Sequence, residues 1–210
     1  LGYSLFLPII SYPAWSLLSI SGDYFRLLVL LIWISIPVII FVICMKIYPE
    51  LKLFYKRKYF YGIIMLTFLV LLFNLSLYYP FSGNIASAPV ESAAVILTNS
   101  ILFSLTVPMV FITCRLLFPT SPYCIFSTFA IISCSSYIFW ATDAKDHILT
   151  IFILSVILYQ FIKYQKYQKD RNAFFGFIGI GFLTWARPEL GFTLFFALLL
   201  YYLVHVAFFV

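Results

Sequence analysis

Apolar runs of about 20 residues, the length a helix needs to cross the hydrocarbon core of a bilayer, recur along almost all of this 210-residue chain. Hydrophobic residues make up 64% of the sequence and charged residues only 10%, which excludes an ordinary soluble domain. The pattern predicts an all-α, polytopic transmembrane bundle of about seven spans. We expect these spans at about 25–45, 59–79, 93–116, 123–140, 148–162, 173–186 and from 191 to the end.

The first segment, 1–22, is apolar as well, but Pro8 and Pro13 interrupt it. Proline removes a backbone donor and disturbs a helix interior, so this segment is predicted to be interfacial or re-entrant rather than a straight span. We therefore expect one transmembrane domain over 1–210, with its transmembrane helices in 25–210. A first residue other than Met and an end within an apolar run are typical of a fragment of a longer protein.

The charged residues divide between the two ends of the predicted spans. If successive spans alternate in direction, ten of the thirteen Lys and Arg fall on one side, which the positive-inside rule assigns to the cytoplasm. They are Lys46, Lys52, Lys56, Arg57, Lys58, Arg115, Lys163, Lys166, Lys169 and Arg171. This pattern predicts a multi-pass protein of the cell membrane. The net charge of +6 then belongs to short loops beside the lipid bilayer and does not indicate nucleic acid binding.

A dense group of ionisable residues, Asp143-Ala-Lys145-Asp146-His147, lies on the predicted outer side at a helix start. Carboxylates beside a lysine and a histidine can bind a divalent metal ion, hold a phosphate or orient an acceptor hydroxyl. A solvated loop in which Asp146 caps the free N–H groups of the following helix fits the same pattern. Both interpretations stay open at the level of sequence.

A second outer group is Trp185-Ala-Arg187-Pro188-Glu189. Fourteen residues separate Asn172 from Arg187, which is about 21 Å of helix and less than the core thickness of about 30 Å. Arg187 is therefore expected below the outer surface, where it should line a polar cavity or pair with Glu189. A structural pair would tie helices together, whereas a functional site would use the guanidinium fork to bind an anion such as phosphate.

Two further features concern single helices. Glu91 opens the predicted third span, either as a capping acid or as an additional site carboxylate. Gly176, Gly179 and Gly181 follow no strand, so they are not a nucleotide-binding fingerprint. We expect these glycines to let a neighbouring helix approach closely.

The order of these features resembles the GT-C class of polytopic membrane glycosyltransferases, in particular its protein mannosyltransferase and aminoarabinose transferase-like branch. The resemblance is carried by Gly2-Tyr3-Ser4 through Pro8 and Pro13, by Gly22 and Arg26, by an outer acid opening a later span (Asp146 or Glu91), and by a basic inner loop, a glycine-rich span and Trp185-Ala-Arg187-Pro188-Glu189. It implies transfer of a sugar from a polyprenyl-phosphate donor to an acceptor, of a chemistry the sequence leaves open, at the outer or luminal face.

The resemblance also implies roles for the outer residues. The phosphate-binding set would be Arg187 with Lys145, His147 and Glu189, and the catalytic carboxylates would be Asp146, Asp143 and Glu91, with a divalent metal ion as a candidate cofactor. In the family the key acid lies in the first outer loop, ahead of the segment that resembles 1–22, so we expect that acid upstream of Leu1.

Two other classes of protein fit the same outer charges. A membrane transporter or lipid flippase would use Arg187, Glu189 and Asp146 as substrate or proton sites. A non-catalytic structural membrane subunit would use them as salt bridges between helices.

Overall fold

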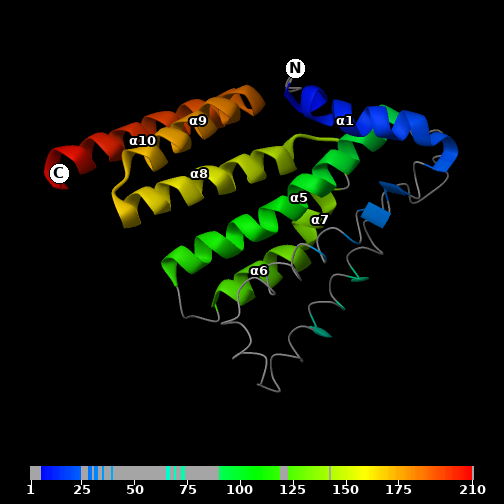
Figure 1. The fold of residues 1–210 in the computed structure, drawn as a ribbon, viewed down its shortest axis with the longest axis horizontal. Helices are drawn as coiled ribbons and strands as arrows, with labels where there is room; N and C mark the ends of the chain where they lie inside the picture. Colours follow the sequence, from blue (N-terminus) through cyan, green and yellow to red (C-terminus); the bar gives the residue numbers. More distant parts are fainter. Residues whose placement is uncertain are drawn as a thin grey trace.

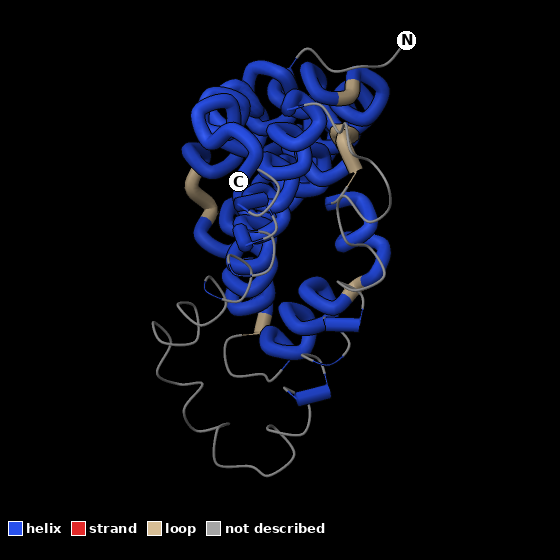
Figure 2. The backbone as a smooth tube through the Cα atoms, turned by 90° about the vertical axis from the view of Figure 1, so that its right-hand side faces the viewer, coloured by secondary structure: helices blue, strands red, loops and turns tan. Residues whose placement is uncertain are grey.

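The computed structural model describes residues 6–24, 90–118, 123–141 and 143–209, together with a few separate residues between 28 and 73. Within these ranges the chain forms helices and no strand, which confirms the predicted all-α class for this part (Figure 2). Most of the predicted spans 25–45 and 59–79 lies outside the described residues, as do the basic residues between them.

The helices of the described ranges follow one another from α1 to α10 (Figure 1). Their bounds are α1 Phe6–Ser21, a 3-10 turn Gly22–Tyr24, α5 Val90–Leu117, α6 Tyr123–Ser133, α7 Ser135–Ala141, α8 His147–Tyr167, α9 Asp170–Ala186 and α10 Pro188–Phe209. Two of them, α5 and α8, are long and apolar enough to cross a membrane. The described residues thus include helices that could cross a membrane, whereas the number of spans stays a prediction.

Two predicted boundaries differ from the observed helices. The predicted span 123–140 is divided into α6 and α7 by an interruption at Cys134. In the N-terminal segment the prolines do not end the helix, and α1 continues through Pro13. Pro8 lies in the first turn of α1. A backbone N–H group there has no intrahelical acceptor, so a proline at this position removes no helix hydrogen bond.

Helices α8 and α9 form an antiparallel hairpin with only Gln168 and Lys169 between them. Gln168 has a left-handed backbone (φ 50°), and its N–H donates to the carbonyl of Tyr164 at 2.7 Å, which ends α8 and reverses the chain. Most of the segment 163–172, predicted as an inner loop between the spans 148–162 and 173–186, is therefore helical. The start of α8 and the end of α9 consequently lie together; following the predicted topology, we call this the outer end and the end with Lys166 the inner end.

Glycines allow the close contact between the two arms of this hairpin. A Cβ built on Gly176 would lie 2.5 Å from Cε2 of Phe161, and one built on Gly179 would lie 2.7 Å from Cγ1 of Ile157. The predicted close helix approach is confirmed at these two positions. It is wrong for Gly181, because a Cβ there would meet nothing within 4 Å.

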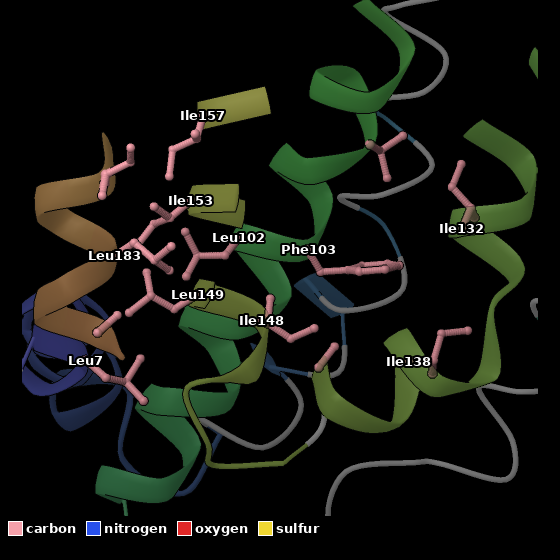
Figure 3. Close-up of a cluster of buried hydrophobic side chains, with 14 of the residues drawn as sticks. Leu7, Leu102, Phe103, Ile132, Ile138, Ile148, Leu149, Ile153, Ile157 and Leu183 are labelled. Atoms are coloured by element: carbon pink, nitrogen blue, oxygen red, sulfur yellow. The ribbon is translucent and has the colours of Figure 1, made fainter. Parts of the chain in front are cut away.

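The main apolar core joins side chains of six of the described helices, α1 and α5 to α9 (Figure 3). It includes Leu102 of α5, Leu149 of α8, Leu183 of α9 and Leu7 of α1. Farther along α1, a second cluster packs Leu18 against the first turns of α5. Helix α1 thus covers the outer parts of both α5 and α9, and this packing fixes where the hairpin ends relative to α5.

Candidate functional site

A bidentate ion pair joins the start of α8 to the end of α9. Nε of Arg187 donates to Oδ2 of Asp146 and Nη2 donates to Oδ1, each at 3.1 Å. The side chains are 28% and 13% exposed, respectively, so most of the pair is withdrawn from solvent. A guanidinium and a carboxylate in this fork geometry are held in one orientation as well as attracted. The turn that brings them together is the one at Gln168.

The capping role predicted for Asp146 is wrong. Asp146 stands at the N-cap position of α8, but its side chain makes no cap hydrogen bond, because both carboxylate oxygens face Arg187. Only its backbone carbonyl serves the helix, accepting from the N–H and the hydroxyl of Thr150, both at 3.0 Å. The carboxylate is thus committed to a contact between helices.

His147 adds a third member to the pair. Its Nδ1 lies 2.9 Å from Nη2 of Arg187. Because a guanidinium only donates hydrogen bonds, Nδ1 must be the acceptor, which leaves the ring proton on Nε2 and the imidazole neutral. The ring also lies against Trp140 of α7, with 3.9 Å between centroids. A neutral, oriented imidazole therefore borders the guanidinium.

A second, more exposed ion pair lies in the turn before α8. Nζ of Lys145 is 3.1 Å from Oδ2 of Asp143, and the two side chains are 53% and 31% exposed. The same ammonium lies 5.2 Å from the centroid of Trp140, within the range of a cation–π contact. Trp140 thus contacts both Lys145 and His147 and connects the two ion pairs.

The turn is attached to α5 by a buried amide. Nδ2 of Asn99 donates to the carbonyl of Asp143 and to the carbonyl of Lys145, both at 2.8 Å. Asn99 is fully buried. Since these carbonyls belong to the backbone, Asn99 fixes the path of the chain that leads into Asp146.

The surroundings favour the charged form of the guanidinium. The hydrogen bond to Asp146, together with the negative charges of Asp146 and Glu189, raises the pKa of Arg187 above its ordinary value, although burial acts in the opposite direction. Glu189 itself is exposed in the first turn of α10. The expected pairing of Arg187 with Glu189 is not the one found, because the fork of Arg187 is directed toward α8.

Five of the seven predicted site residues therefore meet in one network, namely Asp143, Lys145, Asp146, His147 and Arg187. Glu189 contributes at longer range. Glu91 does not join them: it is exposed in the first turn of α5, and the eight positions from Glu91 to Asn99 correspond to about 12 Å of helix. A catalytic role of Glu91 stays a prediction.

The two aspartates of the turn are held by different cations, Asp143 by Lys145 and Asp146 by Arg187. Within the described part of the chain, no three or more His, Cys, Asp or Glu side chains are grouped so that they could hold a metal ion. The candidate divalent metal ion thus finds no ligand set among these residues.

Two residues of the site were not predicted as functional. Trp140 lies at the end of the predicted span 123–140, and its contacts depend on where α7 ends. Asn99 has a sequence signal, since it is an amide in the middle of an apolar run, where polar side chains need an internal partner. That signal points to a buried contact but does not identify the turn at Asp143 as its partner.

Comparisons with protein-family models, with curated proteins and with solved structures found no match for this chain. Function has to be argued from the site itself. Chemically, the site offers a fixed guanidinium whose Nη1 has no hydrogen-bond partner among the described residues, a loosely paired ammonium and two carboxylates. These groups suit the binding of an anionic oxygen beside a base.

Proposed function

We propose that the protein is a multi-pass membrane glycosyltransferase that transfers a sugar from a polyprenyl-phosphate donor at the outer face. One observation carries the proposal: Asp146 holds the half-buried guanidinium of Arg187 by Nε and Nη2, and leaves Nη1 for another acceptor. A phosphate oxygen is a suitable acceptor for an oriented guanidinium. The resemblance to GT-C glycosyltransferases supplies the donor class.

The distribution of polar groups supports a lipid environment. Along α5 the buried side chains include Ser100 and Ser104, and their hydroxyls donate to carbonyls one turn earlier at 2.9 and 2.7 Å. Along α10, by contrast, Phe192 and Phe196 are exposed. Large apolar side chains outside and satisfied polar ones inside are typical of helices whose solvent is hydrocarbon.

Helix lengths support a sunken position for the site. The 17 residues of α9 cover about 26 Å, less than the hydrocarbon core of about 30 Å, whereas the 28 residues of α5 cover about 42 Å. With the basic inner end at the cytoplasmic boundary, Arg187 then lies just inside the outer boundary. A phosphate attached to a polyprenyl chain reaches this depth from the bilayer.

The contacts suggest how the residues divide the reaction. The donor phosphate binds Nη1 of Arg187 and draws Lys145 away from Asp143, because a phosphate competes for the exposed ammonium. The freed carboxylate of Asp143 accepts the proton of the acceptor hydroxyl. That oxygen bonds to the anomeric carbon as the bond from this carbon to the phosphate oxygen breaks, and polyprenyl phosphate leaves with the electron pair, stabilised by Arg187 and Lys145.

The test is sugar transfer by the complete protein in lipid nanodiscs, with a polyprenyl-phosphate hexose as donor. Arg187→Lys keeps the charge but loses the fork, so we expect transfer to fall about 100-fold. Lys169→Arg, at the exposed inner end, is the matched control and should keep wild-type transfer. Melting curves of both variants show whether they are folded.

Two outcomes would contradict the proposal. Wild-type transfer by a folded Arg187→Lys variant would show that the pair only ties α8 to α9, as in a structural subunit. Failure of the wild-type protein to release polyprenyl phosphate from such donors, combined with movement of the intact donor across the bilayer, would identify a flippase instead.

A further inference from the structure

Asn99 donates both N–H groups of its side chain to one turn of the neighbouring segment. The two acceptors are the carbonyls of Asp143 and Lys145, which flank Ala144, and both distances are 2.8 Å. The amide comes from the interior of α5 and is fully buried.

The orientation of the amide follows from its surroundings. If it were flipped, Oδ1 would face two carbonyl oxygens, so Nδ2 must be the atom on that side. Oδ1 is then buried without a hydrogen-bond partner among the described residues. The neighbouring hydroxyl of Ser100 instead bonds within its own helix, to the carbonyl of Ile96. Asn99 therefore holds the turn but leaves its own Oδ1 buried and unpaired, which is unfavourable. Local packing of α5 does not require this arrangement.

We propose that Asn99 is a positioning residue for the outer site, an inference that rests on the proposed glycosyltransferase function. Asp146 follows directly on Lys145, the second residue whose carbonyl Asn99 holds. Fixing both carbonyls sets where α8 begins and therefore where the carboxylate of Asp146 meets the fork of Arg187. Asn99 does not touch the donor. It acts through Asp146, which orients Arg187, and through the backbone that places Asp143.

The sharpest variant is Asn99→Asp, which keeps the size of the side chain. Its ionised carboxylate has no donor and would face two carbonyl oxygens, whereas its protonated form recovers one donor. Asn99→Ala has no donor at any pH. Ser100→Ala is the control, because it removes an adjacent buried polar group of α5 that does not contact the turn.

Two measurements on the complete protein in nanodiscs test the inference. Relative to wild type at each pH, backbone amides 143–150 should exchange hydrogen at least tenfold faster in Asn99→Ala and should be unchanged in Ser100→Ala. In Asn99→Asp, both protection and sugar transfer should approach the wild-type values at low pH and be lost as the pH rises. A purely space-filling role of Asn99 would leave amides 143–150 of Asn99→Ala as protected as those of Ser100→Ala.

The inference is overturned if Asn99→Asp behaves as wild type at all pH values, or if Ser100→Ala loosens the turn equally. Asn99→Asp carries the test if Asn99→Ala does not fold. If the exchange pattern is as expected but the wild-type protein transfers no sugar, the glycosyltransferase function fails while the role of Asn99 in positioning Asp146 against Arg187 stands.

Discussion

The two ends of the α8–α9 hairpin treat their polar residues differently. At the outer end, Asp146, Arg187 and His147 form one network, and the carboxylate is 13% exposed. At the inner end the contacts are separate and exposed: Lys166 donates to the carbonyl of Leu116 at 2.8 Å, and Tyr202 donates to Asp170 at 3.4 Å. The inner charges are distributed as expected for residues that orient the chain in a membrane. The outer charges are held in fixed positions relative to one another.

Substitution of one aspartate at each end tests this difference most directly. Asp146→Asn leaves Arg187 without its carboxylate in a partly buried position, and we expect a loss of about 3 kcal/mol in the free energy of unfolding. Asp170→Asn removes a long, exposed contact and should cost less than about 0.5 kcal/mol. Unfolding titrations of both variants in detergent measure the difference. Equal losses would show that the outer network is no more stabilising than the inner contacts.

Two glycines, one in α9 and one in α10, offer a second comparison between the ends. A Cβ on Gly191, at the outer α9–α10 turn, would overlap Oγ1 and the backbone Cα of Thr184, whereas a Cβ on Gly176 meets the movable ring of Phe161. We expect Gly191→Ala to cost about 3 kcal/mol and Gly176→Ala about 1 kcal/mol.

Gly181→Ala is the control for both glycine variants, since nothing lies near its Cβ. Alanine should there be neutral or stabilise α9 by up to about 1 kcal/mol. Thermal melts followed by circular dichroism are sufficient for this series. A larger loss for Gly176→Ala than for Gly191→Ala would reverse the view that the outer end is the more rigid one.

The smallest effect is expected for the inner lysines. Lys166→Met removes the donor to the carbonyl of Leu116 near the end of α5 and should lower the free energy of unfolding by at most about 1 kcal/mol. Lys169→Met, at an exposed position between the helices, should change it by less than about 0.5 kcal/mol. The same titrations apply. A loss above that for Asp146→Asn would place the main polar tie of the hairpin at its inner end.

Part of this arrangement could be predicted from the sequence. Apolar runs and charge asymmetry predicted helices and placed the turn at Asp143 and the turn at Arg187 on one side. The contact between Asp146 and Arg187 could not be derived, because it depends on the relative lengths of α8 and α9 and on the reversal at Gln168. For the same reason the sequence suggested Glu189, the carboxylate nearest in the chain, as the partner of Arg187.

Other features depend on contacts between segments far apart in the chain. Capping by Asp146 was the sound local expectation, but the guanidinium of Arg187 competes successfully for the carboxylate. The partner of Asn99 depends on how α5 is rotated toward a turn 44 residues away. The interruption at Cys134 has no proline or glycine to mark it.

The antiparallel course of α8 and α9 gives the Asp146–Arg187 pair an electrical direction. Asp146 stands at the amino end of α8, where the helix dipole favours a negative charge, and Arg187 stands at the carboxyl end of α9, where it favours a positive one. Each charge therefore suits its own helix before it meets its partner. Exchanging the two residues would rebuild an ion pair of the same chemistry but place both charges against unfavourable dipoles, so the helix dipoles favour the observed orientation of the pair.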